Sequence, residues 1–208
     1  MAKLNFYYAT MNSGKTIDLL RTAYNYEENH KKVLVMKPLI DTKGGDKIVT
    51  RIGLERKVDF LIGKDDNILS LLVGNIDDVS VIFVDEAQFL TPAQVGQLFE
   101  IAHVLDIHII CYGLRNNFQK KAFAGSAALL ETADDLEELK TLCHCGNIAR
   151  YVGRKLNGVY QTDGDVVVID GTVDVEYVPL CGDCYLKEVM GLDFEEVKSK
   201  MKIKTRKE

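Results

Sequence analysis

The sequence predicts an α/β protein in which helices cover both faces of a parallel sheet, with a small metal-binding lobe on its C-terminal side. Apolar runs typical of buried strands alternate with stretches of helical period through the first part of the chain. The first apolar run leads directly into a loop that carries glycine and lysine. Near the C-terminus, four of the five cysteines stand in two close pairs, which is the spacing of a metal site.

Strands are expected where short apolar runs end at turn signals. The run SVIFVDEA is the most hydrophobic of them. Because strands that alternate with helices form parallel sheets buried on both faces, these runs should share one sheet. The expected strands are 4–9, 32–38, 80–87 and 108–114.

Two helices are expected between these strands. In 16–29, apolar residues recur at helical spacing. Thr91 followed by Pro92 is typical of an N-cap with proline at the first helical position, and this second helix should run to about Leu105. The polar, glycine-bearing passage 41–56 shows no clear period.

The pattern changes near residue 140, where paired cysteines and short hairpin-like stretches replace helix–strand units. We therefore expect a nucleotide-binding α/β domain over 1–139. A zinc-ribbon-like lobe with a substrate segment should follow over 140–192. The basic stretch 193–208 is expected to be a flexible tail.

Length and composition narrow the class of protein. The chain has 208 residues, 47% of them hydrophobic, which suits one main domain with a small appendage. No apolar run approaches the length of a membrane span and no signal peptide is evident, so a cytoplasmic protein without a membrane partner is expected. The formal net charge of −5 argues against nucleic acid as the main partner.

The stretch YATMNSGKT, residues 8–16, matches the phosphate-binding pattern G-x-x-x-x-G-K-[ST] except for Ala9 at the first glycine. In such a loop, backbone N–H groups and a helix N-terminus surround phosphate oxygens. Gly14 permits the sharp turn, Lys15 reaches the β and γ phosphates, and the Thr16 hydroxyl helps to ligate magnesium. Alanine at position 9 fits if its φ is negative. The predicted fold is therefore that of a P-loop NTPase.

Two carboxylates, Asp85 and Glu86, end the most hydrophobic strand. In P-loop proteins an acidic residue at such a strand end holds magnesium, which suits Asp85. A second carboxylate beside it can take a proton from an attacking hydroxyl or water. The alternative is that the pair only ends the strand ahead of the helix at Pro92. The predicted nucleotide-binding residues are Ala9, Thr10, Met11, Asn12, Ser13, Gly14, Lys15, Thr16, Asp85, Glu86, Ala87 and Gln88.

The paired cysteines predict a closed, structural zinc site with four ligands. Cys181 and Cys184 form C-x-x-C, whereas Cys143 and Cys145 form the tighter C-x-C with His144 between them. One alternative is that His144 replaces one of the thiols as a ligand. The other is that all four thiols are free. The fifth cysteine, Cys111, lies in an apolar run and should be a core thiol.

The motifs together resemble the thymidine kinases of many bacteria and of the animal cytosol, over nearly the whole chain. The resemblance rests on ATMNSGKT, VDEAQF, YGLRNNFQKKAFAGS and the cysteine pairs with YVPLC. It implies transfer of the ATP γ-phosphoryl group, with Mg²⁺, to the 5′-hydroxyl of thymidine, or of deoxyuridine. The product would be thymidine monophosphate for nucleotide salvage, and Glu86 would be the catalytic base.

The resemblance also implies the nucleoside site. A flat base is bound by apolar and aromatic walls with few polar groups. The family usually has an arginine near the 5′-hydroxyl, and here Lys43 or Arg51 would replace it; Val152 stands where some relatives have threonine. The residues that match the family's substrate positions are Met11, Phe89, Leu114, Phe118, Phe123 and Tyr177.

Family members are homotetramers inhibited by thymidine triphosphate, so both properties are expected here, with a structural Zn²⁺. Two other functions remain open from the residues alone. One is a nucleic-acid-dependent ATPase with a zinc ribbon, although a helicase core needs a second similar domain. The other is a non-catalytic binding module with an inactive P-loop. The presence of Lys15, Thr16, Asp85 and Glu86 argues against this alternative.

Overall fold

The computed structural model describes residues 1–166 and 174–201, and the chain divides into two compact units. The first unit consists of 1–115 and 122–139. The second consists of 116–121 and the chain from 140 onward. Among the described residues, no helix is long and apolar enough to cross a membrane.

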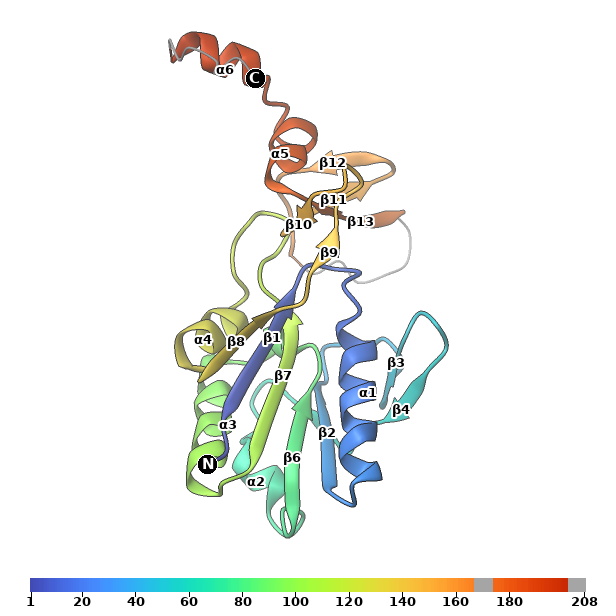
Figure 1. Ribbon diagram of the computed structural model, residues 1–208, viewed down its shortest axis with the longest axis vertical. Coiled ribbons are helices and arrows are strands. Elements are labelled where there is room, and N and C mark those ends of the chain that lie inside the picture. The colour runs from blue at the N-terminus through green and yellow to red at the C-terminus, as the bar shows by residue number, and fades with distance from the viewer. Residues whose placement is uncertain (167–173, 202–208) are drawn as a thin grey trace. The chain divides into compact units, whose positions relative to one another are not determined.

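The first unit is built on a six-stranded sheet (Figure 1). Every neighbouring pair in it is parallel, as predicted. The carboxyl ends of the strands therefore lie along one edge of the sheet, where α/β proteins bind ligands. The strands, in sheet order, are β5 (Phe60–Ile62), β2 (Lys32–Pro38), β6 (Val79–Val84), β7 (His108–Leu114), β1 (Leu4–Ala9) and β8 (Asp135–Glu138).

Both faces of this sheet are buried, which explains why its strands are apolar throughout. In β2, Val33 and Val35 pack in the core on one face, whereas Leu34 and Met36 pack in the core on the other. The first face is covered by α1 (Lys15–Glu28), through Leu19 among others. The helices on the opposite face are α2 (Ile68–Leu72), α3 (Pro92–Val104) and α4 (Ala124–Thr132), as Figure 1 shows.

The polar passage without a clear period contains a small hairpin. Strand β3 (Lys47–Val49) pairs antiparallel with β4 (Glu55–Lys57). Ile48 and Val58 anchor the hairpin in the core beneath α1. Strands of three residues are too short for a period to be visible in sequence.

The N-terminus of α3 is capped as the sequence predicts. The Thr91 hydroxyl accepts a hydrogen bond from the Gln94 N–H at 3.2 Å, and the Gln94 side-chain oxygen accepts one from the Thr91 N–H at 3.0 Å. This reciprocal pair is a capping box, with Pro92 at the first helical position.

The second unit is mainly antiparallel, in agreement with the hairpins expected there. Its core is small and includes Leu180, Tyr185 and Val189. Helix α6 (Phe194–Lys200) forms within the stretch predicted to be a flexible tail, and 202–208 lie outside the described residues. The remaining elements are β9 (Thr141–Leu142), β10 (Ile148–Ala149), β11 (Tyr151–Leu156), β12 (Val159–Gln161), β13 (Val175–Leu180), the short helix α5 (Gly182–Cys184) and the π-helical turn η2 (Tyr185–Val189).

Helix α4 approaches the 3₁₀ turn η1 (Ala87–Phe89) so closely that Gly125 leaves no room for a side chain. A Cβ at Gly125 would lie 2.6 Å from the Ala87 carbonyl oxygen and 2.7 Å from that of Leu90. We predict that Gly125→Ala lowers the free energy of unfolding by about 1–3 kcal/mol, because backbone atoms must move apart.

Gly96 on α3 is the matched control for this prediction. A Cβ there meets nothing within 4 Å, so Gly96→Ala should raise stability by about 0.5–1 kcal/mol through helix propensity. Urea denaturation of both variants measures the difference. Equal effects of the two substitutions would contradict the close approach of α4 to η1.

Candidate active site

The P-loop runs from the end of β1 to the start of α1. Ala9 is the last residue of β1 and lies in parallel register with Leu114 of β7. The turn falls later, at Asn12 and Gly14, whose φ angles are 63° and 81°. Since Ala9 has an ordinary strand conformation, the first glycine of the usual pattern is not required here.

Lys15, the first residue of α1, is almost fully buried, with 8% of its surface exposed. Its ammonium group donates to the Thr10 carbonyl oxygen at 3.0 Å and to the Ser13 hydroxyl at 3.4 Å. Burial lowers the pKa of Lys15, and the carboxylates of Glu86 and Asp85 oppose that shift. The lysine charge and both carboxylates therefore act on one another at the same edge of the sheet.

Asp85 follows β6 and is only 4% exposed. One of its carboxylate oxygens accepts a hydrogen bond from the Glu86 N–H at 3.0 Å. Burial, and next the negative charge of Glu86, raise the pKa of Asp85 to about 7. A buried carboxylate beside a second one is stabilised by a cation, so the chemistry of this pair suits a metal ion such as Mg²⁺.

Glu86 is held in an unusual backbone conformation. Its φ of 50° and ψ of 35° place it in the left-handed region, which for a residue other than glycine costs about 1–3 kcal/mol and is often found at functional sites. The Gln88 amide donates to the Glu86 carboxylate, and the Gln88 amide oxygen accepts from the Leu114 N–H at 3.0 Å. The end of β7 thus fixes Gln88, which in turn orients Glu86.

A cavity of about 270 Å³ opens at this edge of the first unit. It brings together the phosphate-binding loop, Glu86 and Leu114 with two cations, Lys43 and Arg51. Ala9, Thr10, Asp85, Ala87 and Gln88, also predicted as nucleotide-binding, are buried. The residues that line the cavity are Met11, Asn12, Ser13, Gly14, Lys15, Thr16, Ile17, Lys43, Val49, Thr50, Arg51, Glu86 and Leu114.

Three lining residues, Ile17, Val49 and Thr50, were not expected from the sequence. The helical spacing of apolar residues around Ile17 predicts an apolar helix face, but it does not show whether that residue lines a cavity or packs in the core. Val49 ends the short hairpin strand β3 and Thr50 follows it, and the sequence did not reveal this strand. No local pattern in the sequence marks them as part of a site.

The predicted base-binding residues fall into both units. In the first unit, the rings of Phe89 and Phe123 meet edge to face, with centroids 5.7 Å apart and planes at 79°. In the second unit, Phe118 is 1% exposed and Tyr177 lies on β13. Of the six predicted residues, the cavity at the P-loop brings together only Met11 and Leu114.

Phe118 is enclosed by two residues of its own unit. The Arg154 guanidinium lies over its ring, 3.7 Å from the centroid. The Tyr185 hydroxyl donates to the Phe118 carbonyl oxygen at 2.6 Å. The segment 116–121 is therefore held against β11 and η2 by stacking and by a buried hydrogen bond.

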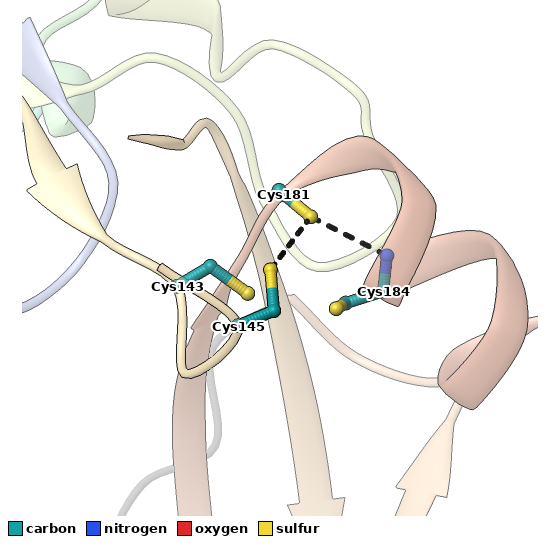
Figure 2. A group of neighbouring side chains, drawn as sticks. All are labelled: Cys143, Cys145, Cys181 and Cys184. Atoms are coloured by element: carbon teal, nitrogen blue, oxygen red, sulfur yellow. Dashed lines mark hydrogen bonds between the residues drawn. The ribbon is translucent and has the colours of Figure 1, made fainter. Parts of the chain in front are cut away.

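The four paired cysteines converge in the second unit (Figure 2). Cys143 and Cys145 come from the turn between β9 and β10, whereas Cys181 is the N-cap of α5 and Cys184 is its last residue. Their sulfur atoms all lie within 4.8 Å of one another, and those of Cys145 and Cys181 are 3.6 Å apart. Zinc–thiolate bonds of about 2.3 Å in a tetrahedron separate sulfurs by roughly 3.8 Å, so the cluster fits zinc.

Hydrogen bonding favours the thiolate form at one cysteine of this cluster. The Cys184 N–H donates to the Cys181 sulfur at 3.5 Å, and this bond is the main cause that lowers the pKa of Cys181 to about 7. A thiolate at neutral pH is the form that binds a metal. His144 lies next to the cluster, with one ring nitrogen 3.0 Å from the Glu188 carboxylate and 3.6 Å from the Cys184 sulfur.

The fold and the first site define a P-loop nucleotide-binding protein: a phosphate-binding turn between a strand and a helix, with paired carboxylates at the same edge of a parallel sheet. A family model described as Thymidine kinase matches residues 2–185. The chain belongs to the thymidine kinase family.

Individual relatives agree over most of the chain. A thymidine kinase from Rhodopirellula baltica is 47% identical over 82% of this chain and 82% of its own length. Those of Mannheimia succiniciproducens and Pasteurella multocida are each 42% identical, over 87% and 91% of this chain and 93% and 99% of their own lengths. The solved structure of the Pif1 helicase from Candida albicans matches with a TM-score of only 0.40 and 17% identity, over 66% of this chain and 36% of that chain.

The raised pKa of Asp85 predicts a pH-dependent stability. The unfolded chain releases this proton near pH 4 and the folded chain near pH 7, so the carboxyl group makes folding less favourable as pH rises through that window. Asn does not titrate, so the free energy of unfolding of Asp85→Asn, taken relative to that of the parent chain, should rise by about 1 kcal/mol or more from pH 5 to pH 8.

Urea unfolding without nucleotide or metal, at the two pH values, measures this gain. The exposed Asp77→Asn is the control and should follow the parent chain at both values. A constant difference between Asp85→Asn and the parent chain would show that Asp85 is not protonated in the folded state near neutrality.

Proposed function

We propose that this chain transfers the γ-phosphoryl group of ATP to the 5′-hydroxyl of thymidine, forming thymidine monophosphate for nucleotide salvage. The observation that carries the proposal is that the P-loop and Glu86 line the same cavity, in a chain of the thymidine kinase family. Deoxyuridine, which lacks only the methyl group of the base, is the expected second acceptor.

The phosphates of ATP would lie against the N-terminus of α1. Backbone N–H groups of 11–16 and the ammonium group of Lys15 supply positive charge there. The Thr16 hydroxyl and Asp85 would hold Mg²⁺, which neutralises negative charge on the phosphates. The burial of Asp85 beside Glu86 supports this assignment, because a cation would relieve the repulsion between them.

Glu86 would act as the general base. Its carboxylate accepts the proton of the 5′-hydroxyl as that oxygen bonds to the γ-phosphorus, while the bond to the oxygen of the leaving ADP breaks. The hydrogen bond from Gln88 orients the carboxylate, and the cations Lys43 and Arg51 line the same cavity. We propose that they take the place of the family's arginine.

The base would be bound by the apolar and aromatic residues that match family positions. Met11 and Leu114 line the cavity, and the pair Phe89 and Phe123 belongs to the same unit. Phe118 and Tyr177, which match the remaining substrate positions of the family, belong to the second unit. Assembly as a homotetramer and inhibition by thymidine triphosphate are further parts of the proposal that come from the family resemblance.

We propose that the four cysteines hold one structural Zn²⁺. A closed set of four thiolates leaves no position for a reacting group, so the ion would stabilise the second unit and take no part in chemistry. A small core tied together by a metal is common in domains of this size.

The first test is a nucleoside kinase assay with Glu86→Gln. The parent chain, ATP and Mg²⁺ should phosphorylate thymidine, and the variant should lose about 10²–10⁴-fold in kcat because the amide cannot accept the proton. Monophosphate formation over a panel of nucleosides measures both.

Glu100→Gln, an exposed position on α3, is the matched control and should keep full activity. Hydrolysis of ATP without phosphorylation of any nucleoside would contradict the kinase proposal. It would leave a nucleic-acid-dependent ATPase as the function to test.

The second test is the zinc content of purified protein. We expect about one zinc per chain, its loss in Cys181→Ser, and its retention in Cys111→Ser, since Cys111 lies buried in β7 outside the cluster. His144→Ala should also keep the metal. Zinc loss in that variant would mean that the imidazole replaces one of the thiolates as ligand.

A further inference from the structure

We propose that Lys37 is a positioning residue for phosphoryl transfer, because it holds the segment 41–47 and so places Lys43 at the P-loop cavity. The inference rests on the proposed kinase function and concerns a residue that does not line the cavity.

Lys37 lies near the end of β2 with 1% of its surface exposed. A buried ammonium group is tolerated only when its protons are all accepted. Its three acceptors are the Asp41 carboxylate at 3.0 Å, the Lys43 carbonyl at 2.8 Å and the Lys47 carbonyl at 3.2 Å. All three lie within residues 41–47, between the end of β2 and the start of β3, and this segment is therefore folded around the Lys37 side chain.

The backbone of Lys43 is held on both sides by this arrangement. Its carbonyl oxygen accepts from Lys37, and its N–H donates to the other carboxylate oxygen of Asp41 at 3.3 Å. Gly44 follows with a φ of 77°, and a Cβ there would lie 2.7 Å from the Lys47 carbonyl oxygen. The loop thus has little freedom while the ammonium group is present.

The side chain of Lys43 is exposed and lines the cavity with Lys15 and Glu86. A cation at this place can contact the phosphoryl group during transfer, and such contacts depend on accurate placement. Lys37 acts on the reaction through Lys43. Without the three hydrogen bonds of Lys37, the segment that contains Lys43 is no longer held in place.

Hydrogen exchange of the free protein tests the anchoring without any substrate. In Lys37→Met, peptides covering 41–47 should exchange at least about 10-fold faster than in the parent chain, whereas peptides of α3 should be unchanged. Lys64→Met, an exposed lysine, is the matched control and should leave exchange in 41–47 unaltered. Unchanged exchange of 41–47 in Lys37→Met would overturn the proposal.

Kinetics test the positioning role. Lys37→Met should lower kcat for thymidine phosphorylation about 10-fold or more with a smaller change in either KM, and Lys43→Ala should do the same. The double variant should be no slower than Lys43→Ala alone, because the first residue acts through the second. The positioning role would be overturned if the losses in kcat of the two single variants multiplied in the double variant. It would also be overturned if Lys37→Met exchanged faster in 41–47 but kept the kcat of the parent chain.

A second variant covers the case in which Lys37→Met does not fold. Asp41→Asn keeps the shape of the acceptor and removes its charge, so exchange in 41–47 should rise and kcat should fall in the same direction, by smaller factors. A parent chain that phosphorylates no nucleoside is a failure of the proposed function, which the exchange measurement separates from failure of the anchoring.

Discussion

Three charged side chains lie almost completely buried at the carboxyl edge of the central sheet, and the site is shaped by what their burial requires. Lys15 donates to a carbonyl within the P-loop, and Lys37 uses three oxygens of the loop that follows β2. Asp85 accepts one N–H and lies beside a second carboxylate, so its ionised form is the least stabilised of the three. Bound Mg²⁺ would correct that imbalance, which connects the electrostatics of the folded chain with the proposed chemistry.

The end of β7 fixes the position of Glu86, the proposed base. Leu114 donates its N–H to Gln88 and accepts a hydrogen bond from the Ser126 hydroxyl at 2.5 Å. Gly113 and Gly125 let the backbones of β7 and α4 come close to η1, since a Cβ at either would crowd its atoms. Glu86 is consequently held in a left-handed conformation that it would rarely adopt alone. The strain is sustained by packing on both sides and keeps its carboxylate at the cavity.

The second unit has a different basis for its stability. Its buried core is small, and two of the buried residues are cysteines of the cluster. Arg154 is fully buried, stacks on Phe118 and donates to the carbonyl oxygens of Asp163 and Asp165. A unit that buries so little apolar surface depends on such contacts between distant segments, and a metal bound by the cysteine cluster would be the strongest of them.

The sequence by itself determined the parallel sheet, the P-loop and the family, because strand runs, the turn pattern and the cysteine spacing are local signals. Even the alanine at position 9 was explicable from its strand context. Only the tertiary structure decided that Lys37 holds the loop containing Lys43, that Gln88 orients Glu86 from the end of β7, and that Phe118 stacks beneath Arg154. A lysine within an apolar strand run was visible, but its acceptors come from a loop with no periodic signal. Contacts of this kind depend on how distant segments meet, which no local pattern records.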